Sequence, residues 1–151
     1  MIKFVHVLLA LGALAVAGCS EDDDAPANSG ATTVNLTLKE FTIAATPSSV
    51  KAGSVKFVAK NQGADLHEVV FVKTDLTPAQ LPKNTDGTFN EDGQGVTVVD
   101  EIEDIAAGAT AEKTIAVTAG HHVLVCNVVE PEEAGPESHF HEGMVVDFTV
   151  Q

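Results

Sequence analysis

The chain is short of positive charge. Arginine does not occur among its 151 residues, and 8 lysines stand against 22 aspartates and glutamates, for a formal net charge of −14 at pH 7. Nucleic-acid backbones are bound by clustered Lys and Arg side chains, so this composition argues against nucleic acid as a partner. An acidic surface favours solubility and the long-range attraction of a basic protein partner.

Helical patterning and long apolar runs are also scarce. No 11-residue window carries a clear apolar stripe with the 3.6-residue period of a helix, although residues 77–81 could open a short one. The longest apolar run, residues 4–17, falls short of the roughly 20 residues that a membrane-spanning helix needs. No nucleophile elbow around Ser or Cys is present, nor a third triad partner in order, so we expect no hydrolytic enzyme.

The N-terminus has the pattern of a secretory signal over residues 1–18. Lys3 supplies a positive start, residues 4–17 are apolar apart from one histidine, and small residues precede Cys19. The segment Val16-Ala17-Gly18-Cys19 resembles a bacterial lipobox, which implies that Cys19 is lipidated and becomes the new N-terminus. We therefore expect an exported lipoprotein, anchored to a membrane and facing the periplasm or the cell exterior. Ordinary cleavage, with Cys19 left as an incidental thiol, is the alternative.

Two further segments follow the signal. Residues 19–33 are rich in Ser, Asp, Ala, Gly and Asn, have almost nothing to bury, and predict an acidic flexible tether. Residues 34–151 are long enough to form one domain with its own core. Their short apolar runs are separated by Gly, Pro, Asn and Asp, a pattern typical of strands and turns. The predicted fold is all-β, a Greek-key antiparallel β-sandwich of about seven to eight strands. The runs are residues 34–39, 54–60, 68–72, 96–99, 113–117, 122–129 and 144–150.

Cysteine is nearly absent as well. The chain has two, so lipidation of Cys19 would leave Cys126 alone in the folded domain. Exported proteins usually pair their thiols, because they meet oxidising conditions. A lone Cys126 is then an inert buried thiol, one half of an intermolecular bridge, a nucleophile or a metal ligand.

Two segments of the domain contain possible metal ligands in a distinctive order. Residues 61–69 read Asn-Gln-Gly-Ala-Asp-Leu-His-Glu-Val. Residues 120–127 end in Cys126 and Asn127, and His139 is separated from Met144 by four residues. These segments resemble the cupredoxin family, the plastocyanin-like small blue copper proteins. The first is similar to the turn that precedes the family's first histidine ligand, and the second is similar to its ligand loop. The resemblance covers roughly residues 34–151.

The resemblance implies one type 1 copper ion held by His67, Cys126, His139 and Met144. Two imidazoles and a thiolate in a trigonal arrangement, with a long axial thioether, suit both Cu(I) and Cu(II). Such a centre would make the protein a one-electron carrier for redox protein partners with a basic docking face. We expect it to act as a monomer.

Several histidines compete for these roles. His141 lacks the four-residue spacing to Met144, so it is expected near the rim, with Asn61 and Asn127 as further candidates for contacts around the site. Side chains alternate along a strand, so His122 is expected to share the inner face with Cys126, and His121 to face the other way.

The spacing of two predicted ligands leaves a second function open. Twelve residues separate Cys126 from His139, whereas the family commonly has two to four, which leaves the copper geometry in question. The alternative function is a copper-binding or trafficking module without electron transfer. A multicopper oxidase would need several His-x-His pairs, and this chain has only His139-Phe140-His141, so we expect no enzyme.

Overall fold

The computed structural model describes residues 31–132 and 135–151. The predicted signal, Cys19 and nearly all of the predicted tether lie outside these residues. Within the described part of the chain, no helix is long and apolar enough to cross a membrane.

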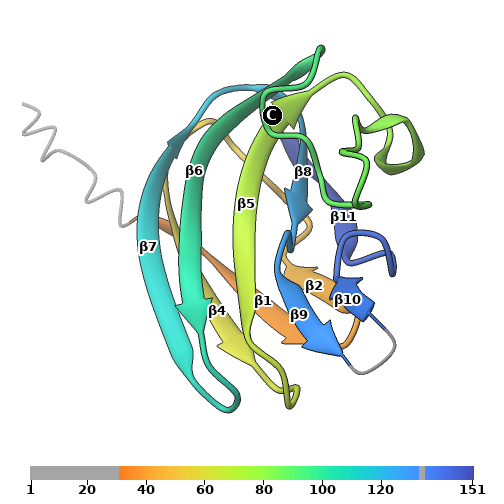
Figure 1. The fold of residues 1–151 in the computed structure, drawn as a ribbon. Helices are drawn as coiled ribbons and strands as arrows, with labels where there is room; N and C mark the ends of the chain where they lie inside the picture. The colour runs from red at the N-terminus through yellow and green to blue at the C-terminus, as the bar shows by residue number, and fades with distance from the viewer. Residues whose placement is uncertain (1–30, 133–134) are drawn as a thin grey trace, which may run out of the picture.

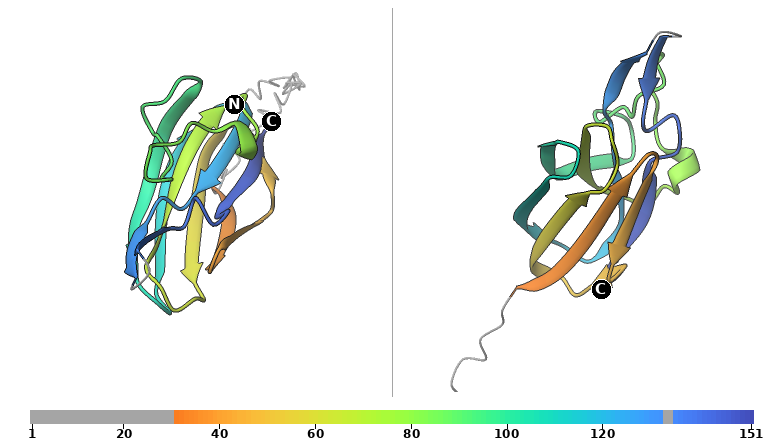
Figure 2. Two further views of the ribbon diagram at one scale, coloured as in Figure 1. Left: turned by 45° about the vertical axis from the view of Figure 1, so that its right-hand side comes forward. Right: turned by 90° about the horizontal axis from the view of Figure 1, so that it is seen from below.

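Two packed β-sheets form the body of the molecule (Figures 1 and 2). The first contains, in spatial order, β2 (Thr42–Thr46), β1 (Thr32–Lys39), β4 (Gly53–Asn61) and β7 (Thr110–Val117). The second contains β3 (Ser49–Val50), β11 (Val145–Val150), β8 (Gly120–Val125), β5 (His67–Thr74) and β6 (Val96–Ile105). A hairpin of β9 (Val129–Glu132) and β10 (Gly135–Ser138) and a 3₁₀ turn, η1 (Pro78–Gln80), complete the elements.

The first sheet follows the predicted alternation of apolar and polar residues. In β1 the side chains of Val34, Leu36 and Leu38 are buried, and in β4 those of Val55 and Phe57 are buried. Successive side chains of a strand point to opposite faces, so this period of two places one apolar face of the sheet against the core. Phe57 lies at the centre, its ring centroid 4.5 Å from that of Phe71 and 5.8 Å from that of Phe148 on the opposite sheet.

Strand β5 is buried on both faces, which explains its unbroken apolar run. Val69 and Phe71 belong to the main core between the sheets. Val70 and Val72 face a second apolar cluster, in which Phe89 and Phe140 from the long loops cover the outer face of the sheet. The loop between β5 and β6 is therefore a packed layer of the fold.

The predicted all-β sandwich is confirmed, with differences in detail. Two pairings are parallel, β1 with β4 and β3 with β11, and local patterning cannot reveal the direction of a partner that is distant in sequence. Strand β1 begins at Thr32, inside the predicted tether, because residues 32 and 33 pair with β4. The strand predicted over residues 122–129 ends at Val125. Val129, the last residue of the predicted strand, instead begins β9 of the β9–β10 hairpin. The predicted short helix is the single turn η1.

The strand arrangement gathers several chain segments at one end of the sandwich. Strands β5 and β8 are antiparallel neighbours, with Val70 opposite Val125, so the start of β5 lies beside the end of β8. Strand β11 is antiparallel to β8, so its first residue, Val145, pairs with Val125 at the same end. His67, Cys126 and Met144 are thereby brought to one end.

We predict that Phe57→Ala lowers the free energy of unfolding by about 3–5 kcal/mol, because it removes a fully buried ring and leaves a cavity. Urea denaturation of the metal-free protein measures the change. Lys60→Ala, at an exposed position on the same strand, is the control and should stay within about 0.5 kcal/mol of the parent. Equal losses for the two variants would contradict the placement of the core.

Candidate metal centre

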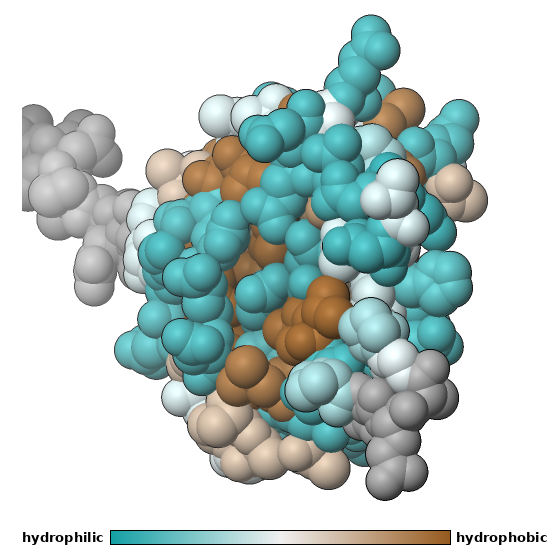
Figure 3. Space-filling view, in the orientation of Figure 1, coloured by the Kyte–Doolittle hydropathy of each residue, from teal (hydrophilic) through white to brown (hydrophobic). Residues whose placement is uncertain are grey.

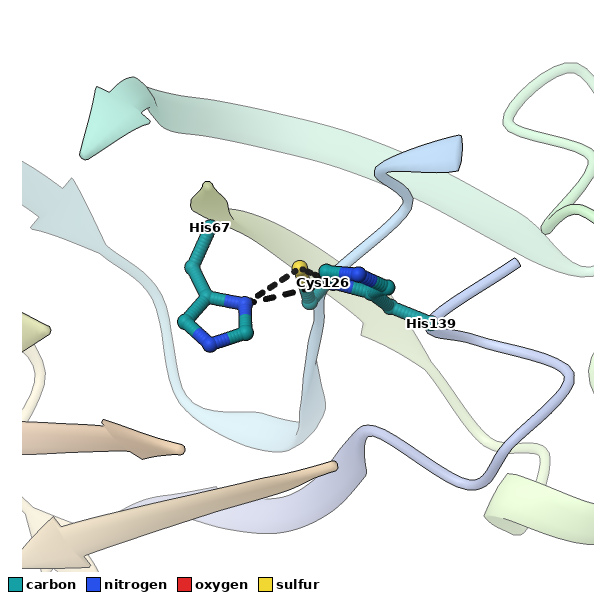
Figure 4. Close-up of side chains that lie close together, drawn as sticks. All are labelled: His67, Cys126 and His139. Carbon is teal, nitrogen blue, oxygen red and sulfur yellow. Dashed lines mark hydrogen bonds between the residues drawn. The ribbon is translucent and has the colours of Figure 1, made fainter. Parts of the chain in front are cut away.

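Three side chains converge at this end of the sandwich. The Sγ atom of Cys126 lies 3.4 Å from Nδ1 of His139 and 3.8 Å from Nδ1 of His67, and the two Nδ1 atoms are 3.2 Å apart (Figure 4). Among the described residues, these are the only three His, Cys, Asp or Glu side chains grouped closely enough to hold a metal ion. Of the predicted ligands, the structure therefore brings together His67, Cys126 and His139.

All three side chains are fully buried. Burial lowers the pKa of His67 and raises the pKa of Cys126 to about 11, because a low-dielectric interior disfavours the charged form of each group. Without a metal, the imidazole of His67 is therefore neutral and the sulfur of Cys126 keeps its proton. A metal ion binding here would displace that proton.

Backbone contacts fix the position of Cys126, the first residue after β8. The Glu68 N–H lies 3.5 Å from Sγ of Cys126 and donates to it, linking the residue after His67 to the sulfur. The Cys126 N–H donates to the carbonyl of Met144 (3.0 Å), and the Met144 N–H donates to the carbonyl of His139 (2.9 Å).

Met144 is held beside the cluster by these two backbone bonds. Its side chain is fully buried and belongs to the same core cluster as Cys126. A buried thioether is a soft, weak ligand of the kind that takes the axial position of a type 1 copper site. The two imidazoles, the thiol and this thioether together form the donor set of such a site.

The β9–β10 hairpin explains how twelve residues can separate Cys126 from His139. Val129 pairs with Ser138 at the base of the hairpin, and the His139 N–H donates to the carbonyl of Val128 (3.0 Å). The inserted residues thus leave the core and return at the point where they left. The twelve-residue gap therefore does not separate the two ligands in space, and the hairpin projects from the end of the domain (Figure 2).

The hairpin is also fastened to the segment that carries the first histidine. The Leu66 N–H donates to the Glu130 carboxylate (3.1 Å). Because Leu66 precedes His67, this bond joins the insert to the opposite side of the cluster.

Asn61 and Asn127 support the site through loops. The Asn61 amide donates to the carbonyls of Asp65 (2.7 Å) and Ile105 (2.8 Å), and its oxygen accepts the Gly63 N–H (2.8 Å), so it organises the turn before His67. The Asn127 side chain accepts the Phe89 N–H (2.7 Å) and donates to the Phe89 carbonyl and to Glu91, fastening the β5–β6 loop to the residue after Cys126.

The remaining histidines lie outside the cluster. His141 is exposed and lines a hollow of about 430 Å³ between the β5–β6 loop and the last ligand loop. His122 is buried and shares the inner side of β8 with Leu124, while the part-exposed His121 contacts Thr74 and Asp147 on the other side. The predicted alternation of the His121–His122 pair is confirmed.

Two residues outside the predicted site also contact the imidazoles. Glu40 and Phe41 form the turn between β1 and β2. Oε1 of Glu40 lies 3.3 Å from Nε2 of His67, and the Phe41 ring stands edge-on to that of His139 with centroids 5.1 Å apart. Neither residue lies in a motif around the ligands, so only their placement in space reveals them.

Acidic side chains near the ligands have perturbed protonation. Backbone N–H groups of Asp65 and Ala64 stabilise the Glu40 carboxylate and lower its pKa to about 2. Burial raises the pKa of Glu68 to about 7, although its carboxylate accepts the Asn127 N–H (3.0 Å). Neighbouring carboxylates, Glu101 among them, contribute to this increase in the pKa of Glu68.

The comparisons with solved structures show a cupredoxin fold. The chain is similar to auracyanin from the photosynthetic bacterium Roseiflexus castenholzii, with 19% identity, a TM-score of 0.51 and coverage of 81% of this chain and 99% of that one. It is similar to auracyanin B, with 19% identity, a TM-score of 0.54 and coverage of 80% of this chain and 89% of that one. It is also similar to rusticyanin from Thiobacillus ferrooxidans, with 13% identity, a TM-score of 0.52 and coverage of 81% of this chain and 79% of that one. No family model and no curated protein matches the sequence.

The raised pKa of Glu68 predicts a pH-dependent stability of the metal-free protein. The folded state holds the Glu68 proton up to about pH 7, whereas the unfolded state releases it near 4.5. The free energy of unfolding should therefore fall as the pH rises through this window, by about 1–2 kcal/mol after allowance for solvent screening. Glu68→Gln should remove this decline, as measured by urea denaturation at about pH 5 and pH 8.

Glu142→Gln, at an exposed position on the last ligand loop, should keep the parent profile. A decline in Glu68→Gln as steep as in the parent protein would show that Glu68 does not cause it.

Proposed function

We propose that the protein binds one copper ion through His67, Cys126, His139 and Met144 and carries single electrons. The convergence of two imidazole Nδ1 atoms and one Cys sulfur in a fully buried cluster carries this proposal. A copper ion bound there would supply a one-electron Cu(II)/Cu(I) couple with soft sulfur and imidazole ligands.

The surroundings of the ligands suit fast electron transfer. Each ligand lies at the end of a strand or on a loop tied to the core by backbone hydrogen bonds, so the donors are held in one arrangement. Similar geometry in both oxidation states keeps reorganisation small. The buried side chains also exclude water, which supports a carrier over an enzyme that must admit a substrate.

The same burial argues against the alternative of copper delivery. A protein that hands on copper needs ligands that a partner can reach, and all three clustered ligands here are fully buried. The extra histidine, His141, is exposed but lies outside the cluster.

The surface around the metal end supports docking of a redox partner. Leu66 and Val129 are the exposed large hydrophobic residues of the described chain, at 38% and 44% exposure, and both lie beside ligand segments. The face seen in Figure 3 is mostly hydrophilic, with small hydrophobic patches, one in the region of β9. The chain has a net charge of −14. We therefore propose a partner protein with a basic surface around a small apolar contact.

Export and anchoring complete the proposal. The signal-like residues 1–18 and the lipobox-like Cys19 support a lipoprotein held at a membrane, outside the cytoplasm, with residues 19–33 as the tether. Reduced forms of both auracyanin and rusticyanin are among the similar structures, and rusticyanin is described as a copper protein, which agrees with a redox role for this fold.

Copper loading tests the proposal directly. The protein with Cu(II) should absorb intensely in the visible through thiolate-to-copper charge transfer, and Cys126→Ser should lose this band entirely, because the thiolate is its source. The measurements are absorption and EPR spectra of both proteins after equal copper loading.

His141→Asn is the matched control and should keep the band, because that side chain is outside the cluster. Absence of the band in the copper-loaded parent protein, with its Cys126 thiol intact, would refute a type 1 centre.

A further inference from the structure

The turn between β1 and β2 places a carboxylate against the first histidine. Oε1 of Glu40 lies 3.3 Å from Nε2 of His67, on the side of the ring opposite the cluster. The His67 ring is fully buried, and its Nε2 has no hydrogen bond in the structure. Glu40 therefore places a carboxylate oxygen beside the ring nitrogen of His67 that does not face the cluster.

The Glu40 carboxylate sits in a shaped recess. The backbone N–H groups of Ala64 and Asp65 both donate to Oε1, at 2.7 and 3.0 Å. A Cβ on Gly63 would lie 2.0 Å from the same oxygen, so only a glycine leaves room for the carboxylate. Three consecutive residues of the turn before His67 thus hold the carboxylate of a residue more than twenty positions earlier.

This placement acts on the His67 ring in two ways. A carboxylate oxygen beside Nε2 favours the tautomer with the proton on Nε2, which leaves the lone pair of Nδ1 directed at Cys126 and His139. A fixed negative charge close to the ligand also stabilises the more positive oxidation state of a bound metal, which lowers its reduction potential.

We infer that Glu40 is a positioning residue that sets the tautomer of His67 and lowers the reduction potential of the metal centre. The effect on the reduction potential rests on the proposed copper site. The effect on the tautomer of His67 is a property of the metal-free chain. Phe41, the next residue, packs on the ring of His139, so one turn contacts both imidazoles.

Two substitutions separate the effect of the Glu40 charge from the effect of the position of its side chain. Glu40→Gln keeps an amide oxygen that can accept the Ala64 and Asp65 N–H groups but removes the negative charge. Gly63→Ala keeps the charge but displaces the carboxylate from its recess, and the displaced group is the end of a flexible side chain, so the fold should tolerate it. A role limited to holding the turn would survive Glu40→Gln unchanged.

Voltammetry of the copper-loaded proteins tests the effect of the Glu40 charge on the reduction potential. Glu40→Gln should raise the ratio of Cu(I) to Cu(II) affinity by about tenfold, which for a one-electron couple is an upward shift of about 59 mV. Gly63→Ala should shift the potential in the same direction. Glu130→Gln is the control, since that carboxylate also accepts an N–H of the turn, from Leu66, without contacting a ligand ring; its shift should be less than a third of that of Glu40→Gln.

Nitrogen NMR of the His67 ring in the metal-free proteins tests whether the position of the Glu40 side chain sets the tautomer of His67. The parent protein and Glu40→Gln should hold the proton on Nε2, and Gly63→Ala should lose this preference. If the ratio of Cu(I) to Cu(II) affinity in Glu40→Gln stays within twofold of the parent ratio, the proposed effect of the Glu40 charge on the potential is overturned. If the His67 ring of the parent protein shows no preferred tautomer, the proposed positioning role of Glu40 is overturned. Failure of the parent protein to form a copper centre would refute the proposed function instead, and the NMR result would still decide the role of Glu40 at His67.

Discussion

Antiparallel pairing of β5 with β8 sets the start of one strand beside the end of the other. His67 begins β5 and Cys126 follows β8, so this single pairing places a histidine and a cysteine 59 positions apart within 3.8 Å. The pairing of β11 with β8 then fixes Met144 at the same end. Because each register is set by apolar side chains on buried faces, a slip of one residue would turn the ligand positions away from the site.

Burial of this donor cluster has a cost that the fold must offset. A thiol and two imidazoles lie in an apolar interior, with Nε2 of both ligand histidines left without a hydrogen bond. The interior shifts the pKa of His67 downward and that of Cys126 upward, so both groups are held uncharged. The core between the sheets and the backbone bonds among residues 126, 139 and 144 hold this arrangement, which leaves the donors ready for a metal ion.

Two peripheral elements complete the site from outside the sandwich. The β9–β10 hairpin carries the chain away after Cys126 and returns it at His139, and Glu130 ties it to Leu66. The β1–β2 turn lays Glu40 against His67 and Phe41 against His139. An insertion that pairs with itself adds surface without changing the distance between the residues that flank it, so the ligand geometry tolerates its length.

By itself, the sequence determined the all-β sandwich, the faces of most strands and the residue types of a copper-type donor set. Alternating burial and the spacing of His139 and Met144 are local features that a linear pattern records. Only the tertiary structure decided the parallel pairing of β1 with β4, the hairpin after Val128 and the contact of Glu40 with His67. These depend on which distant segments meet, and that is set by the packing of the two sheets as a whole, which no short stretch of residues encodes.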